Sequence, residues 1–486
     1  MKSFRYIPLI AALFLLTFCK SEPKNAFQLD VLPTIFPDYT FVNIPPNIAP
    51  LNFLVRDSCQ STYVEATFND KKITAQGDGN HVCFDIDDWK SIVAQAIGNN
   101  IEISVSIEKK DGHFYKYKSF SIYVEKDSID PYLTYRLIEP DYEVFSRLKI
   151  EQRCIENFNT KDICNHNITN NSCMNCHTFA GNNPNTSLFY VRGANGGAIL
   201  NRNGMLKKLN IKNKEMESSS VYGHFSLDGR YFVFSTNVII PGLHADPNKR
   251  MEVFDAKSNV YVADLELCKI ISSPLLSDSS RAETFPCFSA DGRKIFYCSA
   301  PVLRNNVNDI RNVQYDLVSI DFNNGAIGTT TDTIVKANKN DKPISVCLPT
   351  VSPDGKYLIY TEADYGTFPI WHKETELRMI NLQTMATDSL NGVNSQNSDT
   401  YHTFSSNSKW VVFASKRDDG LYGKPYFFHI DANGKTSKPF ALPQEYPDFY
   451  DNCLKSFNIP ELSKGAVPFS TKDVEVLLKR ESVEFE

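Results

Sequence analysis

Several residue types and patterns are scarce in this 486-residue chain, and each scarcity argues against a class of protein. Methionine occurs 7 times and tryptophan 3 times, against 33 phenylalanines and 23 tyrosines, a balance that favours β-structure over helical bundles. Lysine and arginine form no cluster and the net charge is −6, so a nucleic-acid-binding surface is not expected. No Ser-His-Asp arrangement, phosphate loop or paired-carboxylate motif is recognisable, so no hydrolytic or phosphoryl-transfer site is predicted.

Long apolar runs are also missing, except at the start of the chain. Lys2 and Arg5 precede the run YIPLIAALFLLTF, which is too short for a membrane span and is typical of a signal peptide. The run leads to Cys19, and LLTFC resembles the lipobox of bacterial lipoproteins, although Phe18 stands where a small residue is usual. We predict a lipoprotein signal peptide over residues 1–19 with lipidation of Cys19; an ordinary signal peptide cut nearby is the alternative.

The remaining length predicts more than one domain. Residues 20–26 are interpreted as a tether. Residues 27–126 are predicted to form an immunoglobulin-like β-sandwich, because TYVEATF and IEISVSI alternate apolar and polar side chains. The segment DDWKSIVAQAIGNN interrupts this pattern with a helix. Residues 127–183 show little alternation and are interpreted as an extended linker segment with short helices.

Four internal repeats follow the linker segment. They are HFSLDGRYFVFSTN (224–237), CFSADGRKIFYCSA (287–300), TVSPDGKYLIYTEA (350–363) and TFSSNSKWVVFASK (403–416). In each repeat a tight turn, usually Asp-Gly with glycine free to take positive φ, precedes a strand of large apolar residues. The spacing of the repeats suits four-stranded blades.

These repeats predict an all-β propeller over residues 184–462, followed by a C-terminal tail over residues 463–486. Their motifs resemble the blades of TolB-like β-propellers. Six blades are expected and five are the alternative. The sixth blade would be built jointly from the chain before residue 184 and the chain after residue 440, because propellers often close by pairing their two ends.

The most specific chemical motif lies in NNSCMNCHTFAGNN (170–183), where Cys173, Cys176 and His177 form C-x-x-C-H. This spacing is the attachment signature of c-type haem. Two thiols on one helical turn would form thioethers with the haem vinyl groups, and His177 would be an axial ligand of the iron. A Cys173–Cys176 disulfide beside an incidental histidine is one alternative. A zinc site is another, although no second C-x-x-C accompanies the motif.

A low-spin haem iron would also need a sixth ligand from the protein. The candidates are His166, His224, His244, His402 and Met251. We favour His244, because IIPGLHADPNKRMEVFD (239–255) is a long insertion between strands and such loops reach out from a blade. A solvated loop histidine is the alternative reading.

The chain contains 12 cysteines, and export would allow some of them to pair. Cys59 with Cys83 and Cys154 with Cys164 are the local pairs that we consider plausible. The sequence does not determine the connectivity.

The order of lipobox, β-sandwich, YRLIEPDYEV, SCMNCHTF and propeller repeats resembles a family of exported Bacteroidota proteins, the TolB-like propeller lipoproteins with a haem-attachment motif. The resemblance covers most of residues 127–462, including 401–430 and 454–462. It implies a domain plan and one haem c, rather than a settled activity.

From these features we predict a lipid-anchored protein, attached to the outer membrane on its periplasmic or surface side. One haem c would serve electron transfer or redox sensing with an unknown protein partner in the cell envelope. The alternative function is a haem-free propeller that binds protein or peptide partners, with Cys173–Cys176 as a disulfide. An enzyme ranks last, since no nucleophile or acid–base pair can be named.

Overall fold

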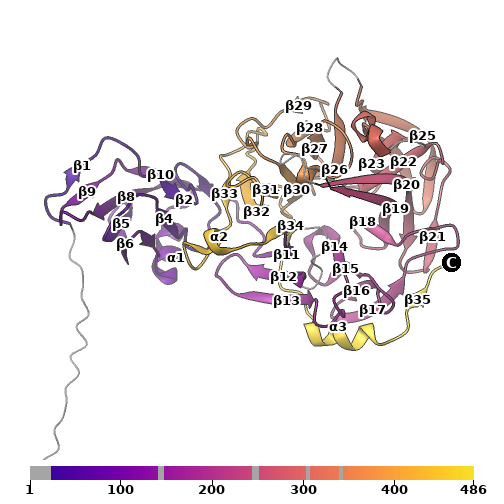
Figure 1. Cartoon of the computed structure of the whole chain (residues 1–486), viewed down its shortest axis with the longest axis horizontal. Helices are drawn as coiled ribbons and strands as arrows, with labels where there is room; N and C mark the ends of the chain where they lie inside the picture. Colours follow the sequence, from indigo (N-terminus) through magenta and orange to yellow (C-terminus); the bar gives the residue numbers. More distant parts are fainter. Residues whose placement is uncertain (1–22, 141–146, 244–250, 303–306, 339–342) are drawn as a thin grey trace, which may run out of the picture.

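The computed structural model describes residues 23–140, 147–243, 251–302, 307–338 and 343–486. The chain forms an N-terminal β-domain beside a six-bladed β-propeller (Figure 1). The predicted all-β class and the six blades are confirmed. Cys19 and His244, the predicted lipidation site and sixth iron ligand, lie outside the described residues. Within the described residues, the helices are all too short or too polar to cross a membrane.

The N-terminal domain contains a seven-stranded and a three-stranded sheet. The larger sheet contains β1 (Phe27–Gln28), β3 (Asn43–Ile44), β5 (Ser61–Phe68), β6 (Lys71–Asp78), β8 (Asn100–Glu108), β9 (Phe114–Lys116) and β10 (Phe120–Val124). The smaller contains β2 (Ile35–Phe36), β4 (Phe53–Val55) and β7 (His81–Val82). The predicted helix is α1 (Ile86–Gln95), whose N-cap Asp85 accepts hydrogen bonds from two backbone amides. An immunoglobulin-like topology for this domain stays a prediction.

Each blade of the propeller is a sheet whose first strand, given first in each group here, lies nearest the central channel. The first two blades are β34 (Ser456–Ser463), β11 (Tyr132–Ile138), β12 (Lys149–Cys154) and β13 (Thr160–Asn165), and then β14 (Met174–Phe179), β15 (Thr186–Val191), β16 (Gly197–Arg202) and β17 (Met205–Asn210). The next two are β18 (Ser220–Phe225), β19 (Tyr231–Leu243), β20 (Met251–Asp264) and β21 (Lys269–Ile271), and then β22 (Arg281–Phe288), β23 (Lys294–Pro301), β24 (Asp316–Asn323) and β25 (Ala326–Val335). The last two are β26 (Ser345–Val351), β27 (Tyr357–Ala363), β28 (Glu376–Asn381) and β29 (Thr387–Asp388), and then β30 (Asp399–Phe404), β31 (Trp410–Ser415), β32 (Lys424–His429) and β33 (Phe440–Ala441).

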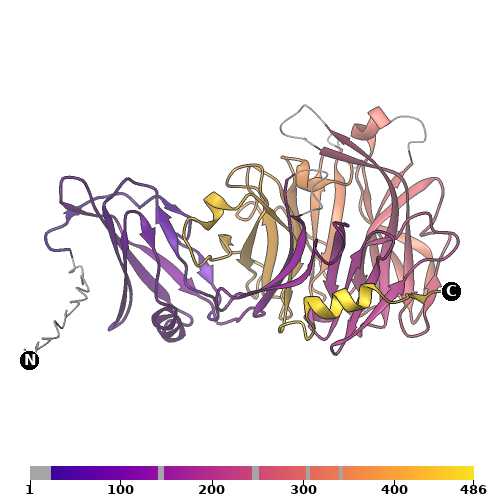
Figure 2. The same ribbon diagram turned by 60° about the horizontal axis from the view of Figure 1, so that its bottom comes forward.

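Four short helices lie in connections or in the tail. They are η3 (Val307–Asn312), η4 (Pro369–Trp371), α2 (Phe449–Asn452) and α3 (Thr471–Leu478), and a further 3-10 turn, η2 (Ala180–Asn182), follows β14. The C-terminal segment continues past α3 into β35 (Val483–Glu484), which pairs in parallel with β17 on the outer edge of a blade (Figure 2). The predicted tail is therefore partly structured, and it covers an otherwise open sheet edge.

The propeller closes through antiparallel pairing of β34 with β11. A strand from the C-terminal region thus completes a sheet from the region before residue 184, as predicted. The interpretation of residues 127–183 as an extended linker with short helices is wrong, because they include β11, β12, β13 and β14. These strands lack alternation because blades pack against each other on both faces; β12, for example, is buried at five consecutive residues.

Both predicted local disulfides are absent, since all eleven described cysteines are free thiols. The register of β12 with β13 explains one case. Cys164 lies opposite Ile150, four residues along the strand from Cys154, or roughly 13 Å at about 3.3 Å per residue. A disulfide requires Cα atoms within about 7 Å of each other.

The repeated turns have one hydrogen-bond pattern. In the turn after β26, the Ser352 hydroxyl donates to Asp354 at 2.7 Å and accepts from the Tyr357 backbone amide at 2.9 Å. Ser226, Ser289 and Ser405 do the same in their blades. The glycine after the aspartate has positive φ at all three Asp-Gly turns, as at Gly355 with φ 72°. The serine therefore fixes the turn that positions each second strand.

We expect Ser352→Ala to lower the free energy of unfolding by about 1–3 kcal/mol, because two hydrogen bonds of a buried hydroxyl are lost. Urea unfolding measures this change. Ser482→Ala, in the connection between α3 and β35, is the control and should leave stability within about 0.5 kcal/mol of wild type. Equal stabilities of the two variants would show that the serine does not fix the turn.

Candidate functional site: a cleft and a chamber at the propeller axis

The inner strands of all six blades carry a β-bulge at the same level. The first residue of each bulge has a left-handed backbone, with φ between 47° and 55°. These residues are Cys176, Tyr222, Phe285, Leu348, Tyr401 and Ile459. In a regular strand successive side chains alternate between faces, but a bulge re-aims them. Left-handed non-glycine residues are costly, and six at one level form a ring that the packed blades must hold in place.

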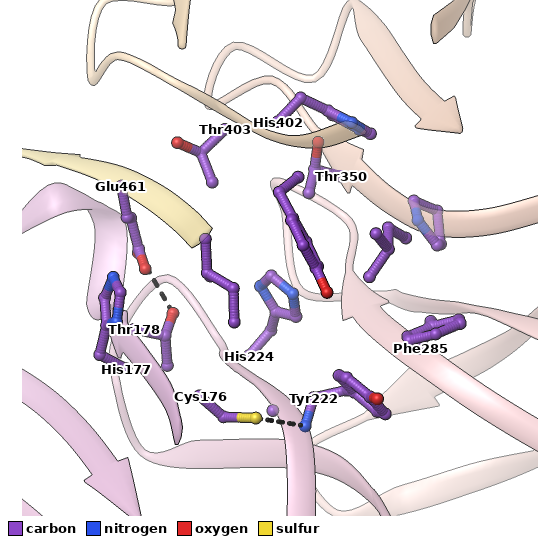
Figure 3. A pocket seen from close by; sticks show the side chains of 15 residues that line it. Cys176, His177, Thr178, Tyr222, His224, Phe285, Thr350, His402, Thr403 and Glu461 are labelled. Carbon is purple, nitrogen blue, oxygen red and sulfur yellow. Dashed lines mark hydrogen bonds between the residues drawn. The ribbon is translucent and has the colours of Figure 1, made fainter. Parts of the chain in front are cut away.

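The C-x-x-C-H motif belongs to this ring. Cys176 and His177 are the bulge residues of β14, and both line the channel. The Cys176 sulfur accepts a hydrogen bond from the Tyr222 backbone amide at 3.3 Å (Figure 3). His177 is 5% exposed and is the counterpart of His402 in β30. The motif is therefore part of a blade strand and not of a helical turn.

The arrangement of these three residues does not fit a c-type haem. Cys173 lines one space, described below as the cleft, and His177 lines another, the chamber, while Cys176 borders both. A haem held by both thiols and ligated by the histidine requires all three side chains to converge on one space. Haem attachment through Cys173, Cys176 and His177 stays a prediction that this geometry does not support.

The chamber is a cavity of about 60 Å³ in the channel, lined by residues of the inner strands. His177, His224 and His402 reach it from β14, β18 and β30 (Figure 3). Burial lowers the pKa of each imidazole to about 4, so all three are uncharged at neutral pH. Glu461 of β34 also lines it, and burial raises its pKa to about 8. Its Oε1 accepts from the Thr178 hydroxyl at 3.2 Å and the Phe179 amide at 2.9 Å.

The cleft adjoins the chamber and has a volume of about 190 Å³. The two spaces share Cys176, Tyr222, Tyr401 and Ile459, four residues of the bulge ring. Three cationic side chains line the cleft, namely Arg136, Arg192 and Lys416. Its apolar wall includes Ile239, Met251, Phe368, Ile370 and Trp371. Lys416 lies over the Trp371 ring, with Nζ 3.6 Å from the centroid.

A buried polar network fixes one wall of the cleft. The imidazole of His372 bonds Glu252 at 3.0 Å and Glu374 at 3.2 Å, and the Tyr365 hydroxyl donates to Glu252 at 2.7 Å. Burial opposes a charge on His372, but the two carboxylates raise its pKa above the ordinary value. The network links two segments of this wall. One is the connection that contains Trp371, and the other is β20, which contains Met251.

Half of the buried polar side-chain atoms that lack a partner in the described residues gather at these two spaces. Fourteen such atoms occur, and seven line the cleft or the chamber: Arg136 Nε, Asn175 Oδ1, Asn458 Oδ1, both ring nitrogens of His177, His402 Nδ1 and Thr350 Oγ1. Buried polar groups are normally satisfied, so unsatisfied groups at one place indicate a bound molecule or water there.

The other predicted ligands are scattered. His224 and His402 line the chamber, and Met251 lines the cleft. His166 follows β13 and lines neither space. Among the described residues, no group of three or more His, Cys, Asp or Glu side chains is placed to hold a metal ion.

Sequence reasoning missed Arg136, Arg192, Trp371 and Glu461. One signal was present: His-Thr-Phe occurs at 177–179 and again at 402–404. Both copies immediately precede a blade turn, so the histidine of the C-x-x-C-H motif could have been assigned to the blade repeat. The arginines carry no such signal, because they come from different blades.

Comparison with known proteins identifies no family. No protein-family model matches the chain, and no curated protein matches it in sequence. Similar solved structures include an oligogalacturonate lyase in complex with manganese (11% identity, TM-score 0.37, covering 63% of this chain and 73% of that one). They also include the periplasmic gluconolactonase of Pseudomonas aeruginosa (14% identity, TM-score 0.34, covering 65% and 98%) and a dipeptidyl peptidase 4 of Porphyromonas gingivalis (8%, 0.30, covering 63% and 52%).

The functional prediction of a haem-bearing electron-transfer or redox-sensing protein is corrected by the geometry of the site. The described residues show no haem-binding site, because Cys173 lines only the cleft and His177 only the chamber. The alternative function also lacks its basis, since Cys173 and Cys176 are free thiols and not a disulfide. Cys176 accepts the Tyr222 amide instead, and its left-handed backbone is set by the bulge.

The state of Glu461 predicts a pH dependence of stability. Its pKa is about 8 in the folded protein against 4.5 when unperturbed, so the unfolded chain loses this proton first as the pH rises. The contribution of Glu461 to stability should therefore fall between about pH 4.5 and pH 8, whereas the three chamber histidines contribute a rise that wild type and Glu461 variants share. Glu461→Gln cannot ionise and should lose less stability over this range, as measured by urea unfolding at about pH 5 and pH 8.

The exposed Glu481→Gln variant is the control and should follow the wild-type profile. Burial also raises the pKa of Glu283 to about 8. Glu283 therefore contributes to the loss of stability with rising pH in every variant. An equal fall in wild type and Glu461→Gln would mean that Glu461 ionises normally in the folded protein.

Proposed function

We propose that the protein binds a small organic acid in the cleft at the propeller axis. The observation that carries this proposal is the environment of Arg136 and Arg192. Both guanidinium groups line the cleft, and neither forms an ion pair or side-chain hydrogen bond with the described residues. The Arg136 Nε is buried without a partner. Arginines without acidic partners at a concave site suit a carboxylate, which accepts two parallel N–H bonds.

The charges around the cleft favour the same class of ligand. Glu139 is an acidic residue of the cleft, and its carboxylate lies 3.3 Å from Arg147. Lys416 and Trp371 add a cation and an aromatic face. A pocket with an apolar wall and a few convergent polar groups is the usual form of a small-molecule site. An acid with a compact ring or chain would place its charge at the arginines and its carbon skeleton against the wall.

The test uses two ring acids, cyclohexanecarboxylate and quinate, with the uncharged cyclohexanecarboxamide for comparison. We expect isothermal titration calorimetry of the full chain to detect binding of an acid but not of the amide. Arg136→Gln and Arg192→Gln should each weaken binding by about tenfold to a hundredfold, the effect of one hydrogen bond to a charged group. Higher salt should also weaken binding, because Arg192 is exposed.

Arg480→Gln is the matched control, since Arg480 is an exposed arginine after α3 that does not line the cleft. It should bind as wild type. Absence of binding by both acids, or equal binding by wild type and the two cleft variants, would refute the proposed function.

We propose further that the protein is exported and anchored to a membrane through a lipid on Cys19. The signal-peptide pattern supports this proposal. The N-terminal domain would then stand in chain order between the anchor and the propeller. In a lipoprotein-processing host, an alkyne-labelled fatty acid should label the wild-type protein but not Cys19→Ser. Cys83→Ser, which removes an exposed thiol, should label normally, and equal labelling of Cys19→Ser would contradict the anchor.

A further inference from the structure

We propose that the chamber holds a hydroxylated, uncharged part of the ligand, so that the ligand is a polyhydroxylated carboxylic acid. This inference rests on the proposed function, since the acid group would lie at Arg136 and Arg192 in the adjoining cleft. The bulge ring borders both spaces through Cys176, Tyr222, Tyr401 and Ile459. One molecule at this ring would contact the arginines on one side and the histidines on the other.

Unsatisfied atoms of the chamber wall carry the inference. His177 is 5% exposed, and the backbones of Thr134 and Ile459 are near its ring without completing a hydrogen bond to either nitrogen. A neutral imidazole has one donor and one acceptor. Satisfying both nitrogens therefore requires one hydrogen-bond acceptor and one donor, and a hydroxyl group can serve as either.

The hydrogen bond of His402 defines which of its two ring nitrogens can accept from a ligand. Its Nε2 lies 2.8 Å from the Ile359 carbonyl oxygen, which can only accept, so Nε2 carries the proton. Nδ1 is then an acceptor, and it is buried without a donor. A ligand hydroxyl can donate to it, whereas a ketone, an ether or a methyl group cannot. The buried Thr350 hydroxyl, which also lacks a partner, lies in the same wall.

The described residues that line the chamber include no arginine or lysine, so the chamber offers no counter-charge to a second acid group on the ligand. The three imidazoles are neutral at pH 7, because burial lowers their pKa values to about 4. Glu461 is protonated, and burial raises the pKa values of the Cys176 thiol and the Tyr222 and Tyr401 hydroxyls. A buried charge without a counter-charge is costly. The part of the ligand in the chamber is therefore polar but uncharged.

The competing expectation is a purely apolar ligand tail, since much of the cleft wall is apolar. Quinate and cyclohexanecarboxylate distinguish the two cases, because they share a six-membered ring with a carboxylate and differ in the hydroxyl groups. We expect calorimetry of the full chain to give at least tenfold tighter binding of quinate. A tail that only packs on the apolar wall would reverse this order.

Thr350→Val tests the chamber with a nearly isosteric change that leaves no new unsatisfied atom. It should weaken quinate binding about three- to tenfold, the value of one hydrogen bond, and leave cyclohexanecarboxylate binding unchanged. Thr331→Val, on the exposed face of β25, is the control and should bind both acids as wild type. A second readout is the ¹⁵N chemical shift of the His402 Nδ1, which should move with quinate but not with cyclohexanecarboxylate.

The outcomes separate the two proposals. Equal or weaker binding of quinate, with no effect of Thr350→Val and no shift at His402, would overturn the hydroxylated ligand and leave the acid-binding cleft standing. Binding of neither acid would overturn both. Tighter binding of quinate with loss in Thr350→Val and in Arg136→Gln would support both.

Discussion

The antiparallel pairing of β34 with β11 is the contact on which the rest of this molecule depends. It joins a strand near the C-terminus to the first strand of the propeller and so completes the blade through which the ring of six sheets closes. A closed ring brings all inner strands to one axis. The cleft, for example, takes Arg136 from β11 and Ile459 from β34. Without this pairing, Arg136 and Ile459 would lie on strands that are not neighbours, and the cleft would not form.

The bulges determine which side chains line the central channel. A regular strand would direct one residue of each adjacent pair toward the channel and the other toward a neighbouring blade. The bulges let adjacent residues such as Cys176 and His177, or Tyr401 and His402, line the same space. This arrangement brings polar side chains together in the channel, and the cost is six residues with left-handed backbones.

Charge is divided between the two sides of the bulge ring. The cleft has two arginines that pair with no acidic side chain among the described residues, while the chamber has imidazoles and a carboxyl group that burial keeps uncharged. The difference follows from access to water. Arg192 is exposed and keeps its hydration, whereas the buried histidines cannot be charged without a counter-ion. A single ligand with one acid group and several hydroxyls matches this division.

The sequence by itself determined the all-β class, the turn of each repeat and the joint blade built from both ends of the propeller. These features are local, since Ser352, Asp354 and Gly355 contact one another within a few residues. Only the tertiary structure decided the role of the C-x-x-C-H motif, because spacing alone cannot distinguish a helical turn from a bulged strand. It also decided the site, since Arg136, Arg192 and Trp371 are far apart in the chain and meet only when the ring of blades closes.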